Sequence, residues 1–505
     1  MQFFKNILSE VWLHQVLKDK CNTYENMVKI TRKKIKIKSN PKRVLPLFLD
    51  LNYNDRIYDI ISKISSLNNN AIEEILNNIF KDFEKRHHDF KNIILDHYQK
   101  ISKNLKLSRE LTLSQKLLIG SYYTKEYSIE SAALFNPSIV IHPNQDNIND
   151  EMIRFIMSLR ATGEGHISSI TFRTGLISKN GEIFLDKALD KVVAAKKVED
   201  IIYNKSFLSK RAKYDNRINT KVFEFLPDAF SMKEVQRIIA EIEQKKILKL
   251  YETEKAISDI FDNNYEVTFN KNIPLNSKVI FPVSKAESQG MEDVRFVKFS
   301  EDNEVSYFGT YTAYNGKDIH VHLINTNDFN TFSIRSLYGK ATMDKGMALF
   351  PEKINGKFAM LSRQGGSCIS IMYSDDIYFW EDYKVIQKPE REWEMLQLGN
   401  AGSPIKTLLG WLLLTHAVGP LRKYVLSATL LDINNPEKVL ASLSKPLISP
   451  NSSEREGYVP NVVYTCGLIY YGDKLFIPYA MSDSATSFVT VDLNLLLREL
   501  QKNIK

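Results

Sequence analysis

Residues 290–295 read Gly290-Met291-Glu292-Asp293-Val294-Arg295, two adjacent carboxylates close to a cation in a segment that otherwise has the composition of a β-strand. Cleavage of a glycosidic bond requires a carboxylic acid that protonates the leaving oxygen, and a neighbouring arginine can orient that acid and adjust its pKa. Glu-Asp pairs are common, however, and an ion pair at the end of a strand is the simpler interpretation of this stretch taken alone. The other motifs of the chain decide between the two interpretations.

Further motifs follow this stretch in the C-terminal half of the chain. They are, in order, Asp344-Lys345, Leu349-Phe350-Pro351-Glu352-Lys353-Ile354-Asn355-Gly356-Lys357, Met360-Leu361-Ser362-Arg363, Pro404-Ile405-Lys406-Thr407 with Gly410-Trp411, and Thr415-His416. Together with residues 290–295, this order resembles glycoside hydrolase family 130 across roughly residues 131–495, as a long member with an extra N-terminal region. The resemblance implies a five-bladed β-propeller with a central active site, and phosphorylase or hydrolase activity on β-mannosides.

The composition is that of a globular protein with two or more structural units, since the chain has 505 residues, 43% hydrophobic and 25% charged. Residues 1–20 contain apolar side chains, but Glu10, His14 and Lys18 interrupt them, so we expect neither a signal peptide nor a membrane span. The cysteines are odd in number and lack metal-ligand spacing, which predicts a reducing, cytoplasmic location and no metal or other cofactor. They are Cys21, Cys368 and Cys466.

The net charge of +8 comes with a basic run, Arg32-Lys33-Lys34-Ile35-Lys36-Ile37-Lys38. Alternating Lys and Ile fits either a nucleic-acid patch or an edge strand with one solvated face. Basic segments interleaved with aromatic residues do not accompany the run, so we predict the edge strand and no nucleic-acid partner. A diffuse positive balance also suits an anionic cosubstrate such as inorganic phosphate.

Hydrophobic spacing divides the chain into regions. From about residue 53 to residue 125, apolar side chains recur at helical intervals, which predicts a helical N-terminal region over residues 1–130. After Asn136-Pro137-Ser138 the period shifts toward two. Helical spacing returns over about residues 187–263, which we interpret as a helical insertion after the first blade.

From Lys278 onward a unit of roughly 50 residues recurs, with two apolar strands around a Gly-containing turn and then a Ser- or Thr-rich stretch with Asp. Such units are typical of propeller blades, and a two-sheet sandwich is the alternative architecture. The spacing leaves the number of blades open, and five comes from the resemblance. We therefore predict a mainly β protein in which residues 131–505 form a five-bladed β-propeller.

The resemblance assigns Asp293 as the general acid, which acts through a sugar hydroxyl in the phosphorylases of the family. Val294 stands where the family has Pro, a change that affects backbone stiffness more than chemistry. Glu292 and Arg295 are then expected to orient the acid and to contact the substrate.

Inverting phosphorolysis requires an oxyanion held opposite the leaving group, so a cluster of cations is expected at the centre of the propeller. By resemblance, the phosphate-binding candidates are Lys345, Arg363, Lys406 and His416. Lys345 stands where the family usually has Arg, and a Lys lacks the fork that makes a bidentate contact with phosphate.

A Tyr-Glu pair of the family reads Ser453-Glu454 in this chain, which removes a hydroxyl-bearing aromatic side chain from the expected phosphate site. Hydrolases of the family also lose phosphate ligands, and they use a carboxylate to activate water. Hydrolysis therefore stays open as an alternative, with Glu454 or Glu456 as the base.

Residues 158–173 carry many hydrogen-bonding side chains for a pair of strands, which is typical of strands that face a wet funnel. We assign Arg160, His166 and Arg173 to sugar or anion binding, with a surface network of Arg and Glu as the alternative. The resemblance adds two further substrate contacts, Asn136 at the start of the first blade and Asp483 late in the chain.

These observations predict an inverting glycoside phosphorylase that acts on β-mannosides or related oligosaccharides, with inorganic phosphate as cosubstrate. The nearest alternative is an inverting hydrolase. The second is a non-catalytic glycan-binding propeller whose helical N-terminal region mediates homo-oligomer formation. A Gly-rich phosphate loop, a Gly-x-Ser-x-Gly elbow and a His-Glu-x-x-His helix are absent from the sequence.

Overall fold

The structure is a computed structural model that describes residues 28–51, 54–103, 110–302 and 304–504. Residues 1–27, which include Cys21 and the segment considered above as a signal peptide, lie outside the described residues. Strands predominate in the described part of the chain, so the prediction of a mainly β protein is confirmed. The helices of these ranges are all too short or too polar to cross a membrane.

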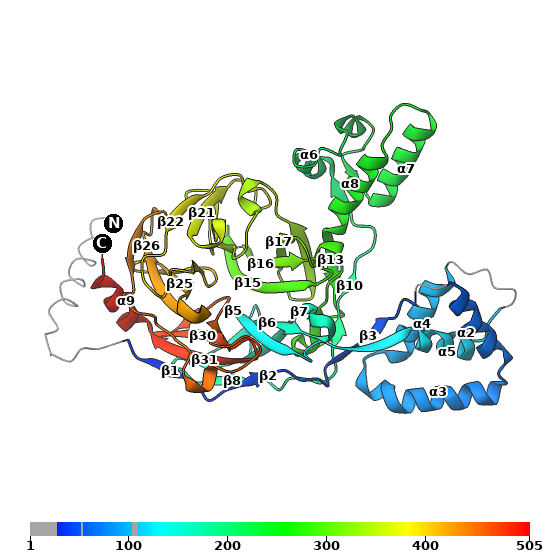
Figure 1. The fold of residues 1–505 in the computed structure, drawn as a ribbon, viewed down its shortest axis with the longest axis horizontal. Helices are drawn as coiled ribbons and strands as arrows, with labels where there is room; N and C mark the ends of the chain where they lie inside the picture. Colours follow the sequence, from blue (N-terminus) through cyan, green and yellow to red (C-terminus); the bar gives the residue numbers. More distant parts are fainter. Residues whose placement is uncertain (1–27, 52–53, 104–109, 303, 505) are drawn as a thin grey trace.

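A helical lobe near the N-terminus occupies the segment where the sequence shows helical spacing. Its helices are α2 (Asn54–Ser66), α3 (Asn69–Phe83), α4 (Phe90–Ser102) and α5 (Leu113–Tyr122). Their apolar faces share a core that includes Ile72, Ile94 and Leu118. A two-stranded sheet of β3 (Val44–Phe48) and β4 (Thr124–Ser128) connects this lobe to the rest of the molecule (Figure 1).

The basic run lies at a sheet edge, as the edge-strand interpretation predicts. Strands β1 (Ile30–Arg32) and β2 (Ile37–Lys38) pair antiparallel with β31 (Ala485–Asp492). Residues 30–38 therefore belong to the last sheet of the chain. The region over residues 1–130 therefore contains strands beside its helices, because the alternating side chains of this segment suit one solvated strand face.

Most of the remaining strands form five groups in chain order, and hydrogen-bonded neighbours within a group are antiparallel. The first group holds β5 (Ala133–Ile141), β6 (Met152–Thr162), β7 (Ser168–Ser178) and β8 (Ile183–Leu185). The second holds β15 (Gly290–Glu301), β16 (Glu304–Tyr314), β17 (Ile319–Thr326) and β18 (Thr331–Ser336). The third holds β19 (Ala348–Leu349), β20 (Phe358–Ser362), β21 (Ile369–Ser374) and β22 (Lys384–Gln387).

The fourth group holds β23 (Gln397–Asn400), β24 (Ile405–Thr407), β25 (Gly410–Val418), β26 (Tyr424–Leu431) and β27 (Val439–Ser442). The fifth holds β28 (Val463–Tyr464), β29 (Ile469–Tyr471), β30 (Lys474–Met481) and β31. The first two groups belong to one 12-stranded sheet because Gly290 pairs with Ser168. Gly290 has a φ of +131°, and a Cβ there would lie 2.6 Å from the Ser168 nitrogen, so this junction requires glycine.

Each group shares a hydrophobic core with the next, and the fifth shares one with the first. Representative core partners, taken around the molecule, are Phe172 with Phe296, Val321 with Met360, Leu361 with Leu413, Leu426 with Leu475, and Phe488 with Phe155. The groups therefore follow one another and return to the start, as Figure 1 shows.

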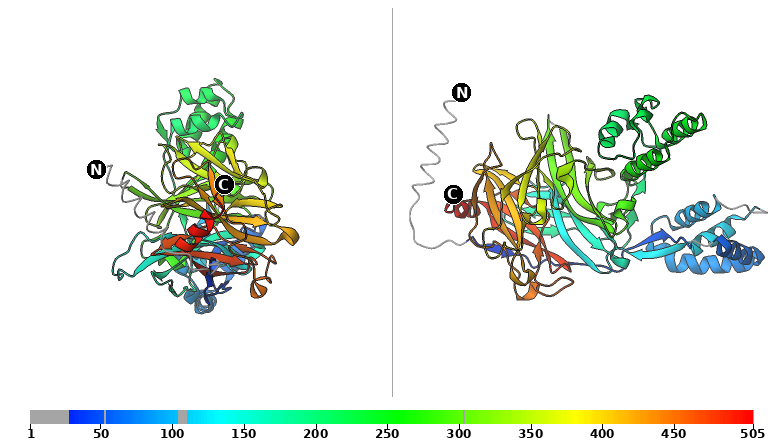
Figure 2. Two further views of the ribbon diagram at one scale, coloured as in Figure 1. Left: turned by 90° about the vertical axis from the view of Figure 1, so that its left-hand side faces the viewer. Right: turned by 45° about the horizontal axis from the view of Figure 1, so that its top comes forward.

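The helical insertion lies between the first and second groups. Its helices are α6 (Lys205–Ala212), α7 (Met232–Gln244) and α8 (Tyr251–Asp262), packed around their own core. The helices begin later than residue 187, because residues 193–197 form short strands that pair with β14 (Lys278–Ile280) and with β13 (Asn264–Thr268). After α8, β13 pairs with β18 and so extends the second group. Figure 2 shows the insertion and the N-terminal helices as two separate projections.

Candidate active site

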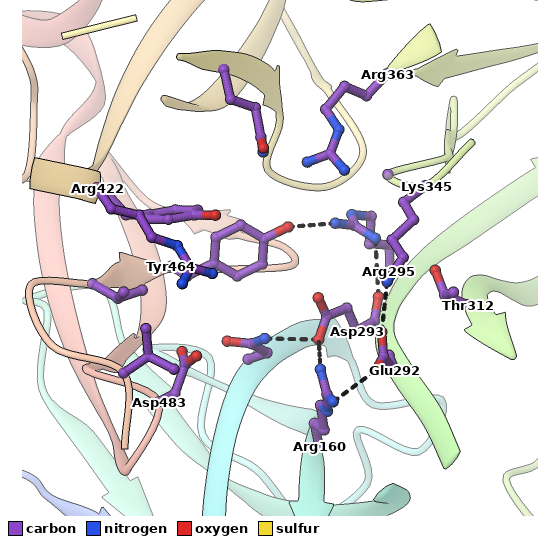
Figure 3. Close-up of a pocket in the computed structure, with 16 residues that line it drawn as sticks. Arg160, Glu292, Asp293, Arg295, Thr312, Lys345, Arg363, Arg422, Tyr464 and Asp483 are labelled. Atoms are coloured by element: carbon purple, nitrogen blue, oxygen red, sulfur yellow. Dashed lines mark hydrogen bonds and ion pairs between the residues drawn. The ribbon is translucent and has the colours of Figure 1, made fainter. Parts of the chain in front are cut away.

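A pocket of about 230 Å³ is lined by residues from all five strand groups and the loops between them (Figure 3). Eight residues singled out from the sequence line it: Asn136, Arg160, Glu292, Asp293, Arg295, Lys345, Arg363 and Asp483. The other lining residues are Thr312, Gly346, Gln397, Arg422, Tyr424, Val459, Val462 and Tyr464.

The backbone directs several of these side chains into the pocket by local irregularities. Asp293 (φ 56°) lies where the β15–β16 register shifts, and Asn136 (φ 48°) lies where the β5–β6 register shifts. Arg422 (φ 53°) and Asp483 (φ 49°) lie in turns, between β25 and β26 and between β30 and β31. Left-handed residues other than Gly are uncommon, and bulges re-aim side chains next to functional sites.

Arg160 joins the two adjacent carboxylates. Its guanidinium donates to Glu292 Oε1 at 2.8 Å and to Asp293 Oδ1 at 3.3 Å. Asn136 Nδ2 also donates to Asp293 Oδ1, at 2.7 Å, and Lys345 Nζ lies 3.0 Å from Glu292 Oε2. Oδ2 of Asp293 receives no hydrogen bond from a described residue, so one carboxylate oxygen is available to a substrate.

Arg295 supports the backbone that carries Asp293. Its guanidinium donates to the Asp293 carbonyl oxygen at 3.1 Å and to the Tyr464 hydroxyl at 2.6 Å. Arg295 is buried, with 4% of its surface exposed. Its position therefore fits the orienting role that the sequence predicts, and not that of a free cation.

The two aspartates of the pocket have opposite pKa shifts. Burial acts to raise the pKa of Asp293, but the charges of Arg160 and Arg295 and the hydrogen bond from Asn136 outweigh it and hold the pKa below its usual value. Burial, together with the negative charge of Asp293, raises the pKa of Asp483 to about 7. Near neutral pH the pocket therefore holds an ionised Asp293 and a partly protonated Asp483.

Two pocket cations, Arg363 and Arg422, have no ion-pair partner among the described residues. Lys345 pairs with Glu292, whereas Arg363 and Arg422 form no ion pair with any residue of the described ranges. Nε of Arg363 is buried and has no hydrogen-bond partner there either. Figure 3 shows Arg363 across the pocket from Arg160, with Asp293 between them. An oxyanion fits this arrangement, because planar guanidinium groups bind phosphate oxygens in a bidentate manner.

A family model described as beta-1,4-mannooligosaccharide phosphorylase matches residues 247–502, about half of the 505-residue chain. The chain belongs to glycoside hydrolase family 130. A 1,2-beta-oligomannan phosphorylase of Thermoanaerobacter sp. strain X514 is 34% identical over 224 residues, which cover 43% of this chain and 74% of the relative. A beta-1,2-mannobiose phosphorylase of Listeria innocua is 29% identical over 233 residues, covering 45% of this chain and 64% of the relative.

Among solved structures, that of a beta-1,2-mannobiose phosphorylase from Listeria innocua with beta-1,2-mannobiose has a TM-score of 0.46 and 21% identity to this chain. The match covers 74% of this chain and 93% of that structure.

His416 of this family 130 chain lies behind the pocket wall and not in it. It is fully buried, its Nδ1 lies 3.1 Å from the Asn400 carbonyl oxygen, and its Nε2 lies 3.1 Å from the Gln397 side-chain nitrogen. Burial and the nearby charges of Arg363 and Arg295 hold the pKa of His416 well below its usual value. His416 is therefore neutral, and the expectation of a fourth phosphate-binding cation is not met at this position.

Lys406 is also absent from the pocket. It pairs with Glu352 and lines a different cavity with Phe296 and Ser300. On β15, those two residues lie beyond Asp293 toward the C-terminal end of the strand, so this cavity opens at the other end of the strands. The sequence motif identifies a lysine at this position, but it does not show at which end of the strands the side chain lies.

Arg173 and His166 lie outside the pocket for different reasons. Arg173 is buried and donates to Glu130 at 3.0 Å, and Glu130 also accepts from Arg43 at 2.7 Å. His166 is exposed, and its Nδ1 lies 3.1 Å from the Tyr458 hydroxyl. Arg173 therefore belongs to a network of Arg and Glu, which was the alternative for this segment, but this network is buried and not on the surface.

The two glutamates considered as bases of a hydrolase do not line the pocket. Glu454 is buried and accepts from Arg32 at 2.9 Å and from the Tyr479 hydroxyl at 2.6 Å. Burial acts to raise the pKa of Glu454, but these two hydrogen bonds lower it below its usual value. Glu456 is exposed on the surface of the same loop.

Arg422, Tyr424 and Tyr464 are pocket residues that the sequence analysis missed. Arg422 follows Gly419-Pro420 in a turn between two apolar strands, which is the same kind of position as Asp483. Comparing this turn with the equivalent turn that carries Asp483 could have singled out Arg422 from the sequence. The local sequence does not single out Tyr424 or Tyr464, because each lies in an apolar strand. Only the assembled fold determines which side of that strand faces the pocket.

Proposed function

We propose that this protein is an inverting glycoside phosphorylase that cleaves β-mannosides with inorganic phosphate as the nucleophile. The observation that carries the proposal is the placement of Asp293 across the pocket from Arg363, a cation without a counter-ion from the described residues. The named activities of the relatives support the same reaction class.

In this reaction a phosphate oxygen, held by Arg363 and Arg422, attacks the anomeric carbon from the face opposite the glycosidic oxygen. The glycosidic bond breaks as the new carbon–oxygen bond forms, and a proton from Asp293 reaches the leaving oxygen through a sugar hydroxyl. The products are a sugar 1-phosphate of inverted configuration and the shortened saccharide. Asp293 is left as a carboxylate and takes up a proton from solvent before the next turnover.

Substrate binding favours the protonated form of Asp293, which a general acid requires. The charges of Arg160 and Arg295 lower the pKa of Asp293, and the negative charge of a phosphate held in the same pocket by Arg363 and Arg422 acts against them. Displacement of water by the sugar further favours the neutral acid. Both changes raise the pKa of Asp293 as the complex forms, which is the direction that general-acid catalysis requires.

The positions of Glu454 and Glu456, the two candidate bases of a hydrolase, favour phosphorolysis. An inverting hydrolase needs a second carboxylate that activates water. Glu454 is held by Arg32 and Tyr479, and Glu456 is exposed outside the pocket, so neither candidate base meets the substrate.

The strand groups support a propeller architecture. We infer that the five groups are five blades, because each shares a core with its neighbours and all contribute to one pocket.

The thiols of Cys368 and Cys466 are free, which fits a cytoplasmic enzyme. We also retain the proposal that the N-terminal helices support a homo-oligomer, which the mass of the protein in solution tests.

Replacing Asp293 with Asn separates the enzyme from a glycan-binding module. Asn preserves size but cannot donate the proton, so turnover of β-1,2- and β-1,4-linked mannosides should fall by about three or more orders of magnitude while saccharide binding persists. Calorimetry on the same variant measures that binding. Wild-type protein that binds saccharides without turnover, in the presence of phosphate, would contradict the proposal.

A further inference from the structure

The helical insertion forms a second cleft, of about 450 Å³, against the second strand group. Its walls include Arg211, Tyr214 and Asn263 from the insertion, and Tyr338, Lys340 and Met343 from the loop after β18. Figure 1 shows the insertion rising beside β13 and β17, on the edge of the molecule away from β25 and β26.

The cleft and the active-site pocket lie at the same end of the same strands. Glu292 and Thr312 line the pocket and are paired across β15 and β16. Thr312 is in turn paired with Val321 of β17, whose carbonyl oxygen accepts from the nitrogen of Leu337 in the cleft wall. Three strand spacings of about 4.8 Å place the cleft roughly 14 Å from Glu292. A saccharide of a few units spans such a distance.

One loop forms a wall of both sites. Gly339, Lys340, Thr342 and Met343 line the cleft, and the next residues bring Lys345 and Gly346 to the pocket. Asp344 holds the loop in place, since its carboxylate accepts from the Lys345 nitrogen at 2.7 Å and the Gly366 nitrogen at 2.8 Å. A ligand that extends from the pocket along this loop therefore arrives at the cleft.

The cleft offers aromatic rings beside unsatisfied polar atoms. Tyr214 is 41% exposed, and its ring centroid lies 6.4 Å from that of Tyr338. Arg211 is fully buried and stacks at 3.7 Å on Tyr338, and its Nε has no hydrogen-bond partner among the described residues. Oδ1 of Asn263 is likewise buried without a partner there.

These features match the chemistry of a sugar ring. A pyranose presents apolar C–H groups to an aromatic face, and its hydroxyls both donate and accept. Arg211 and Asn263 line the cleft, and each keeps one polar atom without a partner among the described residues, so the wall can offer a donor and an acceptor to sugar hydroxyls. Arg217, at the rim, is paired with Asp215 at 2.7 Å and Asp259 at 3.0 Å, so the rim is polar without a large excess of charge.

We propose that this cleft binds the distal sugar units of an oligomannoside whose reacting bond lies in the pocket. The inference rests on the proposed function, because the pocket supplies the other end of the chain. It makes the insertion a determinant of substrate length, and longer oligomannosides are the preferred substrates.

The test is Tyr214→Ala in the full chain, assayed with phosphate on β-linked mannose oligomers of increasing length. Loss of the exposed ring should reduce kcat/KM for long oligomers about tenfold more than for the disaccharide. Tyr251→Ala is the matched control, because Tyr251 is a 69% exposed tyrosine of the same insertion that does not line the cleft. Met343→Ala, on the opposite wall and 77% exposed, provides an independent variant that leaves the insertion intact.

Equal effects of Tyr214→Ala on short and long substrates, or no effect at all, would overturn the inference. If the wild-type protein cleaves none of the oligomers, the proposed function fails. Binding of the longest oligomer, measured by calorimetry, then tests separately whether the cleft holds sugar units. Weaker binding by Tyr214→Ala and Met343→Ala than by Tyr251→Ala would then support the cleft. Equal binding by all three variants, or no binding to wild type, would reject it.

Discussion

Replacing Arg363 with Met removes the cation that the account places on phosphate. Two charge-assisted hydrogen bonds of about 1.5–3 kcal/mol each connect a guanidinium to a phosphate. For a solvent-accessible pocket we take the lower end, about 3 kcal/mol in total, which corresponds to roughly a 100-fold rise in the KM for phosphate. Because Arg363 has no ion pair with a described residue, its loss leaves no protein carboxylate unpaired, and the melting temperature should change little.

The assay is the initial rate of sugar 1-phosphate formation at saturating β-mannoside while the phosphate concentration varies. Lys406→Met is the matched control, since Lys406 is a motif cation that pairs with Glu352 in another cavity. Its KM for phosphate should equal that of the wild type. A phosphate KM within about twofold of wild type for Arg363→Met, or an equal rise for Lys406→Met, would refute the assignment of the anion site.

Three further predictions follow from other charged groups. Ionisation of Asp483 above its pKa of about 7 adds a negative charge beside Asp293, so the KM for phosphate should rise above pH 7, and Asp483→Asn should abolish the part of that rise due to this group. Arg173→Met should lower the free energy of unfolding by about 2–3 kcal/mol through its lost bond to buried Glu130, while the phosphate KM stays constant. Burial acts to raise the pKa of Glu287, but hydrogen bonds from His322 and Tyr311 lower it from 4.5 to about 2. Its stabilisation is therefore present above pH 4.5 and lost as the pH falls toward 2, by about 3 kcal/mol at 1.36 kcal/mol per pKa unit. Melting temperatures against pH should show this fall, and Glu287→Gln should flatten it.

Local pattern predicted the elements of the fold well where one side of an element is buried. The helical spacing before residue 125 corresponds to α2–α5, and the period of two after residue 138 corresponds to strands that include β6 and β7. Pairing across long sequence distances was not predictable from local pattern. Strand β1 joins β31 over more than 450 residues, and the short strands at residues 193–197 are defined only by partners on β13 and β14.

The site was predictable where a motif coincides with a backbone irregularity. The carboxylates of residues 292–293 and the side chain of Asn136 occupy two bulges that face the pocket. Two predicted phosphate-binding residues do not line the pocket because of where they lie on their strands. Lys406 lies at the other end of the strands, and His416 is buried behind Gln397. Arg422 was missed because a turn residue reaches the pocket only once the blades are assembled around it.

Phosphorus NMR of the products formed from β-mannosides, with and without inorganic phosphate, tests the proposed reaction most directly. We expect the wild type to form a sugar 1-phosphate of inverted configuration only when phosphate is present. We expect Asp293→Asn to form this product far more slowly. Release of free sugar at the same rate without phosphate would contradict the account, because water would then be the nucleophile in a pocket whose unpaired arginines were assigned to an anion.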